Sequence, residues 1–296
     1  QTTSFILSQQ LHGDANGVKI AERHRRYANI VGLLFLCNPA SVFFSTTYSE
    51  SLFAALVFTG SYGMARWGPL GALLPWTLAT ATRTNGSLYT GYMMLVGAGH
   101  LVQFKRSKWL RIRDFFVCLV VGDYILYPLY RHNRNGIAYH CESSSDNGLS
   151  SSRFEWCEEA RNNRYFFLYS YIQRKHWNVG FMRYYELRQI PNFLLAAPIL
   201  TLSLLAVMHW IRHSWRLAAS ADQKPFFQQA IIWVVESLQQ FVATEGPRPA
   251  TQLTDSQVAV MHPSALGHFA VLAVATLLGL TTAHVQISTR LLCSSS

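Results

Sequence analysis

The stretch YSYIQRKHWNVGFMRYYELRQIPNFLLAAP, residues 169–198, changes character near its middle and decides the fold class. Its first part mixes tyrosines, amides and charged side chains, whereas the chain is apolar from Ile190–Pro191 as far as Ile211. A helix needs about 20 apolar residues to cross the hydrocarbon core of a bilayer. Aromatic and polar residues beside such a run are typical of a membrane interface. The stretch therefore predicts entry into a membrane, next to either a binding surface or an ordinary anchoring belt.

The same segregation of apolar and charged residues extends over the whole chain. Half of its 296 residues are hydrophobic and only 14% are charged, against about 25% in a typical soluble domain. Apolar runs cover residues 27–47, 51–65, 69–82, 87–104, 115–130, 191–211 and 262–283. Because helices satisfy their own backbone hydrogen bonds in lipid, we predict an all-α, polytopic integral membrane protein with about seven transmembrane helices. A soluble protein with buried helices is the alternative.

Basic clusters between these runs predict the orientation. Dense positive charge occurs at residues 19–26 and 105–113 and at Arg212 and Arg216, and alternation of the runs places all of it on one face. Positive charge in short loops marks the cytoplasmic side, so the net charge of +10 does not indicate nucleic-acid binding. The predicted order is a polar N-terminal segment (1–26), five transmembrane helices (27–130), a luminal loop with a polar and aromatic site (131–190), a sixth helix (191–211), a cytoplasmic loop (212–260), and a seventh helix with its tail (261–296).

Two of the five cysteines, Cys141 and Cys157, lie in the predicted luminal loop. That compartment is oxidising, so we predict a disulfide between them, which would stabilise the loop by about 3 kcal/mol. Two free thiols are the alternative. His132 and His140 are near in sequence, but the spacing is not that of a zinc site, and no metal or cofactor is predicted.

Two polar groups lie at the predicted luminal ends of the early runs. Glu50 follows Asn38-Pro39, where the proline breaks or kinks the helix. Its carboxylate either faces a cavity or caps the next helix near the positive end of the dipole. Arg83 and Asn85 lie in ATRTNG, residues 81–86. The guanidinium either binds a phosphate with its planar set of donors or anchors the chain at the interface. Asn85-Gly86-Ser87 is a formal glycosylation acceptor, but it adjoins a span, and we predict that it is unmodified.

A third polar group comprises Gln173, Trp177 and Asn178 in the opening stretch. Amide side chains and an indole ring are suited to holding a sugar through hydrogen bonds and stacking. None of these residues is a catalytic acid or base. The sequence contains no phosphate-cradling glycine loop, HExxH motif, nucleophile elbow or paired carboxylates. Residue types and spacing alone indicate a membrane protein with a luminal polar site.

Four blocks resemble the GPI mannosyltransferase 2 family and occur in the family's order. They are NPASVFFSTTYSESLFAALVF (38–58), ATRTNG (81–86), the stretch 169–198, and HVQISTR (284–290). The resemblance implies a GT-C type glycosyltransferase in the endoplasmic reticulum membrane. Such an enzyme transfers the second mannose, in α-1,6 linkage, from dolichyl-phosphate-mannose to the GPI anchor precursor on the luminal side. The reaction would be inverting, with a carboxylate base and no cofactor.

The resemblance also implies roles for individual residues and partners. Gln173, Trp177 and Asn178 are implied as active-site or acceptor-binding residues. Glu50, Arg83 and Asn85 are implied to line the donor site, with Arg83 as the phosphate contact. The implied partners are membrane lipid, the lipid-linked donor, the GPI precursor and a membrane partner subunit.

One departure from the family concerns the catalytic residue. The family carries its expected catalytic Asp in a Trp-Asp motif near the N-terminus, and no Trp-Asp pair occurs in this sequence. We therefore assign no base, and we expect the chain to be truncated at both ends relative to the family. A non-catalytic membrane subunit or pseudoenzyme of anchor assembly is the alternative. A transporter or channel is disfavoured because only Asp123 lies clearly within an apolar run.

Overall fold

The computed structural model describes a helical protein. It covers residues 22, 25–26, 28–33, 36–37, 48–104, 106–142, 154, 156–163, 166–178, 180–183, 185–219, 226–243 and 266–281. Within these ranges there is no β-strand, which confirms the all-α prediction. The helices are α4 (Glu50–Trp67), α5 (Pro69–Thr82), α6 (Leu88–Leu101), α7 (Lys108–Ile137), α8 (Trp156–Asn162), α9 (Leu168–Trp177), α10 (Ile190–Ala219), α11 (Phe226–Ala243) and α12 (Leu266–Thr281). Short 3-10 turns cover Thr84–Ser87 and Leu187–Gln189, and a π-turn, Ala138–Glu142, continues α7.

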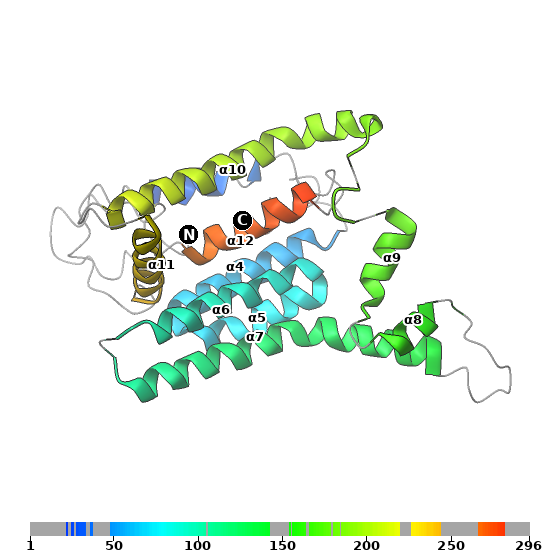
Figure 1. The fold of residues 1–296 in the computed structure, drawn as a ribbon, viewed down its shortest axis with the longest axis horizontal. Coiled ribbons are helices and arrows are strands. Elements are labelled where there is room, and N and C mark those ends of the chain that lie inside the picture. The colour runs from blue at the N-terminus through cyan, green and yellow to red at the C-terminus, as the bar shows by residue number, and fades with distance from the viewer. Residues whose placement is uncertain are drawn as a thin grey trace.

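Most of the helices lie side by side, and α9 and α11 cross their ends. In Figure 1, α10, α12, α4, α6 and α7 run in roughly the same direction, while α11 crosses one end of the set and α9 crosses the other. α4 packs mainly on α5, and α7 packs on both α5 and α6. α12 lies between α10 and α6, in contact with both.

The hairpin of α4 and α5 forms the centre of the core. Gly68 joins the two helices at φ +70°, a conformation that favours glycine, and Pro69 begins α5 with a φ already suited to a helix. Trp76 of α5 is fully buried. Its ring stacks on Tyr89 at 4.6 Å between centroids, and its Nε1 donates to the Val57 carbonyl at 3.3 Å. These contacts hold α4, α5 and α6 together.

Most of the apolar runs correspond to helices, but the structure corrects their extent. The run 69–82 matches α5, and the runs 51–65, 87–104, 191–211 and 262–283 overlap α4, α6, α10 and α12. The fifth helix, α7, begins before residue 115 and continues past 130 to Ile137, because a helix can extend into water at both ends of its apolar part. The first run, 27–47, lies largely outside the described residues.

The segment 212–260 was expected to be a loop, and this was wrong for α11. Its sequence, FFQQAIIWVVESLQQFVA, alternates apolar residues with glutamines and Glu236, so it contains no long apolar run. The helix instead buries one side against α6, α10 and α12. By length and composition, α10 alone among the described helices qualifies to cross a bilayer; α12 is apolar but shorter.

Candidate functional site

An ion pair joins the start of α4 to the end of α5. Arg83 Nη1 lies 2.7 Å from Glu50 Oε1, and the two side chains are 17% and 1% exposed. The same nitrogen lies 3.5 Å from Ser49 Oγ. The hairpin makes this pairing possible, because the first turn of α4 and the residue that ends α5 meet at one end of the bundle. A buried carboxylate is costly without such a partner, so Glu50 fixes the position of the guanidinium.

The turn after Arg83 is held close to α5. The Gly86 amide donates to the Arg83 carbonyl at 3.0 Å, and Gly86 lies so near Thr80 that a Cβ would overlap the Thr80 backbone. Asn85 is half-buried in this turn. The region 83–87 therefore has a fixed backbone that leads directly into α6.

A pocket opens beside Arg83, between the end of α5, the second half of α7 and the start of α9. Its volume is about 370 Å³, within the range of small-molecule sites. It is lined by Thr80, Ala81, Thr82, Arg83, Thr84, Pro128, Leu129, His132, Asn133, Phe167, Leu168, Tyr169 and Ile172. Arg83 is permanently charged, while the described lining contains no carboxylate. An anionic group attached to an apolar body suits this combination.

Two features keep α9 against α7 and so complete the pocket. The Asn133 side chain donates from Nδ2 to the Phe166 carbonyl at 3.0 Å and accepts at Oδ1 from the Leu168 amide at 2.8 Å. It thereby satisfies backbone groups at the start of α9, where a helix has free N–H groups. Asn133 positions the wall of the pocket.

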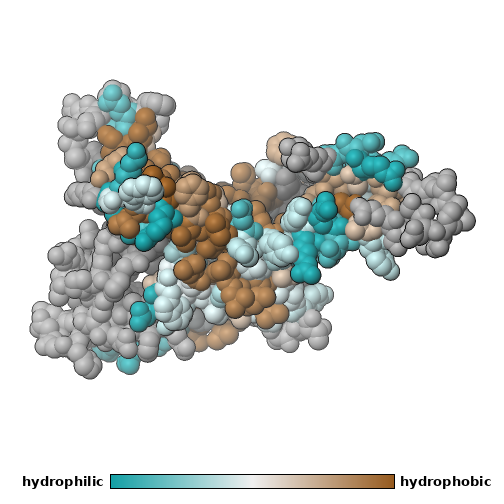
Figure 2. All heavy atoms as spheres, turned by 90° about the horizontal axis from the view of Figure 1, so that it is seen from below, coloured by the Kyte–Doolittle hydropathy of each residue, from teal (hydrophilic) through white to brown (hydrophobic). Residues whose placement is uncertain are grey.

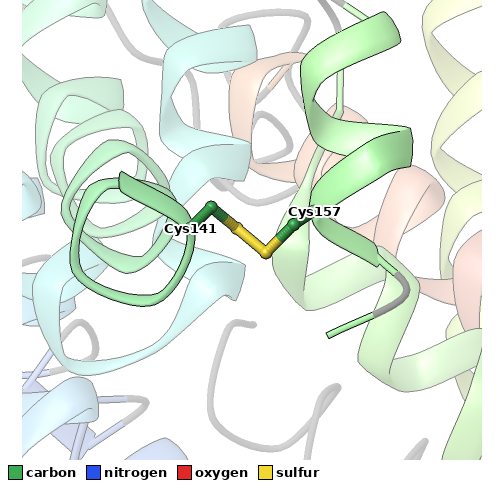
Figure 3. The surroundings of a disulfide bond; sticks show 2 residues. All are labelled: Cys141 and Cys157. Carbon is green, nitrogen blue, oxygen red and sulfur yellow. A yellow bond between two sulfur atoms is a disulfide. The ribbon is translucent and has the colours of Figure 1, made fainter. Parts of the chain in front are cut away.

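The second feature is a disulfide between Cys141 and Cys157, which confirms the prediction. It joins the π-turn after α7 to α8, with the Cα atoms 5.6 Å apart (Figure 3). Beside it, Trp156 stacks on Phe166 at 5.9 Å between ring centroids. Arg174 of α9 pairs with Glu159 of α8 at 3.0 Å. In the described part of the chain no group of three or more His, Cys, Asp or Glu side chains could hold a metal ion.

The structure brings together some of the sequence-predicted site residues. Glu50 and Arg83 are paired, and Asn85 follows in the next turn. Gln173 is half-buried on α9 but does not line the pocket, and Asn178 is exposed where α9 ends, with φ at +50°. The Trp177 side chain lies outside the described residues.

The residues after α9 are attached elsewhere, at the end of α12. The Met182 amide donates to the Thr281 carbonyl at 2.7 Å, and the Tyr185 hydroxyl donates to the Leu280 carbonyl at 2.7 Å. The Tyr185 ring also contacts Phe193 of α10, with ring centroids 5.0 Å apart. This part of the opening stretch therefore connects α9 to α10 and α12.

Among the pocket residues that sequence reasoning missed are two polar ones on α7, His132 and Asn133. They follow the fifth apolar run directly, at the same end of the bundle as Arg83. The sequence could have indicated this, because the runs 69–82 and 115–130 are both predicted to end on the luminal side. The polar residues that follow each run are therefore expected near one another.

Comparison with known proteins places residues 3–296 in a match to the mannosyltransferase (PIG-V) family. GPI alpha-1,6-mannosyltransferase 2 of Cricetulus griseus is 30% identical over 92% of this chain and 54% of its own length. GPI mannosyltransferase 2 of Drosophila pseudoobscura pseudoobscura is 31% identical over 89% of this chain and 56% of its own length. The chain thus spans about half the length of these relatives. No solved structure matches it.

Proposed function

This chain belongs to the mannosyltransferase (PIG-V) family, and we propose that it takes part in transferring the second mannose of the GPI anchor. The donor in this proposal is dolichyl-phosphate-mannose, the acceptor is the GPI precursor, and the new linkage is α-1,6. The name of the Cricetulus griseus relative supports the α-1,6 linkage, and the names of both relatives support mannosyl transfer to GPI. The donor and the luminal side of the endoplasmic reticulum membrane are what the resemblance to the family implies.

We further propose a GT-C type, multi-spanning arrangement of about seven transmembrane helices. The side-by-side packing of α4, α5, α6, α7, α10 and α12 supports it. Arg106 and Arg113 lie near the end of α6, where Asp114 binds both, and Arg216 lies near the end of α10. The Arg83 pocket is at the opposite ends of these helices. This distribution agrees with basic cytoplasmic ends and a luminal pocket.

The observation that carries the proposed site is the fixed guanidinium of Arg83 at the wall of a pocket whose described lining has no carboxylate. In the transfer, the bond between mannose C1 and the phosphate oxygen breaks, and a bond forms between C1 and the acceptor hydroxyl oxygen. The acceptor proton passes to a carboxylate base, and dolichyl phosphate leaves with the bonding electron pair. Negative charge thus grows on the phosphate, and a positioned arginine stabilises it.

Complementation of cells that lack the second anchor mannosyltransferase tests this proposal, with surface levels of an anchored reporter as the readout. Arg83→Gln should lower rescue by about tenfold to a hundredfold at equal protein level, because a hydrogen bond to a charged group contributes roughly 1.5–3 kcal/mol. Arg66→Gln, at the other end of α4, is the matched control and should rescue like the parent chain. Full rescue by Arg83→Gln would overturn the assignment of the phosphate contact. The parent chain is tested beside a version extended to include the Trp-Asp motif of the family, and no rescue by either, with normal expression, would favour a non-catalytic membrane subunit.

A further inference from the structure

The polar side chains that line the Arg83 pocket differ in whether the chain already satisfies them. The hydroxyls of Thr80 and Thr82 donate to carbonyls one turn earlier in α5, at 3.1 and 2.7 Å. The Asn133 amide bonds two backbone groups at the start of α9. The main hydrogen-bonding groups of these three side chains are therefore used in shaping the walls.

A second set of polar side chains lines the pocket without such contacts. In the described part of the chain, no hydrogen bond or ion pair engages the side chains of Thr84, His132 or Tyr169. Within the same residues, Arg83 makes its contacts through Nη1, which leaves Nε and Nη2 for a ligand. These groups lie on three walls, at the end of α5, in the second half of α7 and at the start of α9. Polar groups that converge in a mostly apolar pocket are typical of ligand recognition.

His132 and Tyr169 lie on either side of one fixed joint between α7 and α9. The side chain of Asn133, the residue after His132, accepts at 2.8 Å from the amide of Leu168, the residue before Tyr169. This bond fixes the backbone that carries one side chain against the backbone that carries the other. A ligand that reaches both groups therefore meets them without first having to order either helix, which lowers the cost of binding.

The hydrogen-bonding capacity of the pocket differs from one wall to another. At the end of α5, the Arg83 guanidinium only donates and the adjacent Thr84 hydroxyl can donate, which matches the acceptor oxygens of a phosphate. On the other walls, the Tyr169 hydroxyl both donates and accepts, and a neutral imidazole such as that of His132 has one nitrogen of each kind. Sugar hydroxyls also donate and accept, whereas an isoprenoid chain does neither. His132 and Tyr169 therefore match a sugar attached to the phosphate.

The position of the pocket suits a sugar that is linked to a lipid. α9 and the last part of α7, beyond the apolar run 115–130, lie at one end of the helix set (Figure 1). Figure 2 shows apolar surface over the middle of the molecule and hydrophilic side chains toward its ends. The wall of the pocket also includes the apolar residues Pro128, Leu129 and Ile172. A lipid chain can thus pack against apolar residues while its sugar lies at a hydrophilic end.

We propose that His132 and Tyr169 bind the sugar hydroxyls of a lipid-linked glycosyl phosphate whose phosphate is bound by Arg83. This inference rests on the function proposed above and assigns the residues that recognise the sugar of the donor. Both side chains are exposed, so water can satisfy them before the ligand binds, and each new hydrogen bond adds a modest gain. The expected contribution is about threefold to tenfold in affinity per side chain. These contacts end when the sugar is transferred to the acceptor.

Calorimetric titration of the purified chain with two probes tests the inference. The probes are citronellyl mannosyl phosphate and citronellyl methyl phosphate, two phosphodiesters of equal charge that differ in the sugar. The parent chain should bind the mannosyl probe about tenfold more tightly than the methyl probe.

Variants of the pocket should separate the sugar contacts from the phosphate contact. Tyr169→Phe and His132→Leu should each weaken the mannosyl probe about threefold to tenfold and change the methyl probe by less than about twofold. His132→Gln, which keeps a donor and an acceptor, should retain most of the preference, and Arg83→Gln should weaken both probes. Tyr130→Phe, at an exposed tyrosine outside the pocket, is the matched control and should change neither affinity.

Equal affinities of the parent chain for the two probes would overturn the inference. Tyr169→Phe and His132→Leu variants that weaken both probes alike would also overturn it, because they would place these side chains at the phosphate. Either result, with both probes still weakened by Arg83→Gln, would leave the proposed phosphate site intact. No binding of either probe to a parent chain with a normal unfolding transition would overturn the Arg83 site itself. Because the titration measures binding alone, a chain that transfers no sugar can still give the expected result.

Discussion

Removing the charge of Arg83 should destabilise the protein as well as weaken the pocket. At 2.7 Å between Nη1 and Oε1, two unit charges attract by about 6 kcal/mol with an effective dielectric constant near 20. Desolvation offsets much of that attraction, and the 17% exposure of Arg83 admits some screening by water. What remains for Arg83→Gln is the cost of leaving Glu50, 1% exposed, without its partner. We expect a loss of about 3 kcal/mol, the lower end for breaking a buried pair.

Removing the charge of Glu50 instead should cost less stability. Glu50→Gln leaves an arginine that borders an open pocket and can be hydrated there, so we expect a loss of about 1–2 kcal/mol. Since neither partner is left charged and alone in the double variant, its loss should be smaller than the sum of the single losses. The cycle should return a coupling free energy of about 2 kcal/mol between Glu50 and Arg83.

Thermal unfolding in detergent, followed through the eight tryptophans, measures these differences. A loss of about 3 kcal/mol corresponds to a midpoint lowered by roughly 6–12 °C in a protein of this size. Arg66→Gln, an exposed change of the same chemistry, should stay within about 0.5 kcal/mol of the parent. Additive losses in the double variant, or an Arg83→Gln midpoint equal to that of Arg66→Gln, would refute the view that Glu50 positions Arg83.

Three further predictions concern the surroundings of the site. The disulfide joins two cysteines 16 residues apart, and replacing both Cys141 and Cys157 by Ser should cost about 3 kcal/mol of local stability. The double variant should therefore be proteolysed faster within residues 131–190. Cleavage at the parent rate would contradict a structural role for this disulfide. Gly99→Ala should lower the unfolding midpoint, at a cost of about 1–3 kcal/mol, because its Cβ would overlap Val242 of α11. Gly91→Ala on the same helix is the control. Nothing lies within 4 Å of a Cβ at Gly91, so this change should be neutral or stabilising. Equal effects of the Gly99 and Gly91 substitutions on the unfolding midpoint would refute the close packing of α6 and α11. Ile172→Trp should fill the pocket and weaken binding of dolichyl phosphate at least tenfold without lowering the midpoint, whereas unchanged binding would show that the lipid phosphate lies elsewhere.

The fold was predictable where apolar length alone decides the structure. α5 occupies the predicted residues 69–82, because a proline start and an uninterrupted apolar run leave little choice. α11 could not be found in this way. Gln239 donates to the Val102 carbonyl at 2.6 Å and Trp233 donates to Ser214 Oγ at 3.1 Å. One glutamine that interrupts the apolar pattern is thus satisfied just after the end of α6, and the Trp233 indole is satisfied by α10, which only the tertiary structure reveals.

Individual residues of the site were predictable from the sequence, but the contacts between them were not. Arg83 was identifiable as a phosphate contact or an anchor because it ends an apolar run. Its pairing with Glu50 depends on how the α4–α5 hairpin closes. His132 and Asn133 were read as part of a loop because the apolar run stops at Tyr130, whereas α7 continues as a helix to Ile137. A helix that extends beyond its apolar part carries polar side chains on defined faces, and here one of those faces forms the pocket.

Glu50 and Asp123 are both acids in apolar surroundings, and the difference between them separates two kinds of site. The carboxylate of Glu50 is buried and paired inside the chain, so its charge is used to hold an arginine at a pocket. Asp123 is exposed on α7, and no Lys or Arg occurs in any apolar run that could reach it. The cost of burying the Glu50 charge is therefore offset within this chain by Arg83, whereas the Asp123 carboxylate lies at the surface of α7.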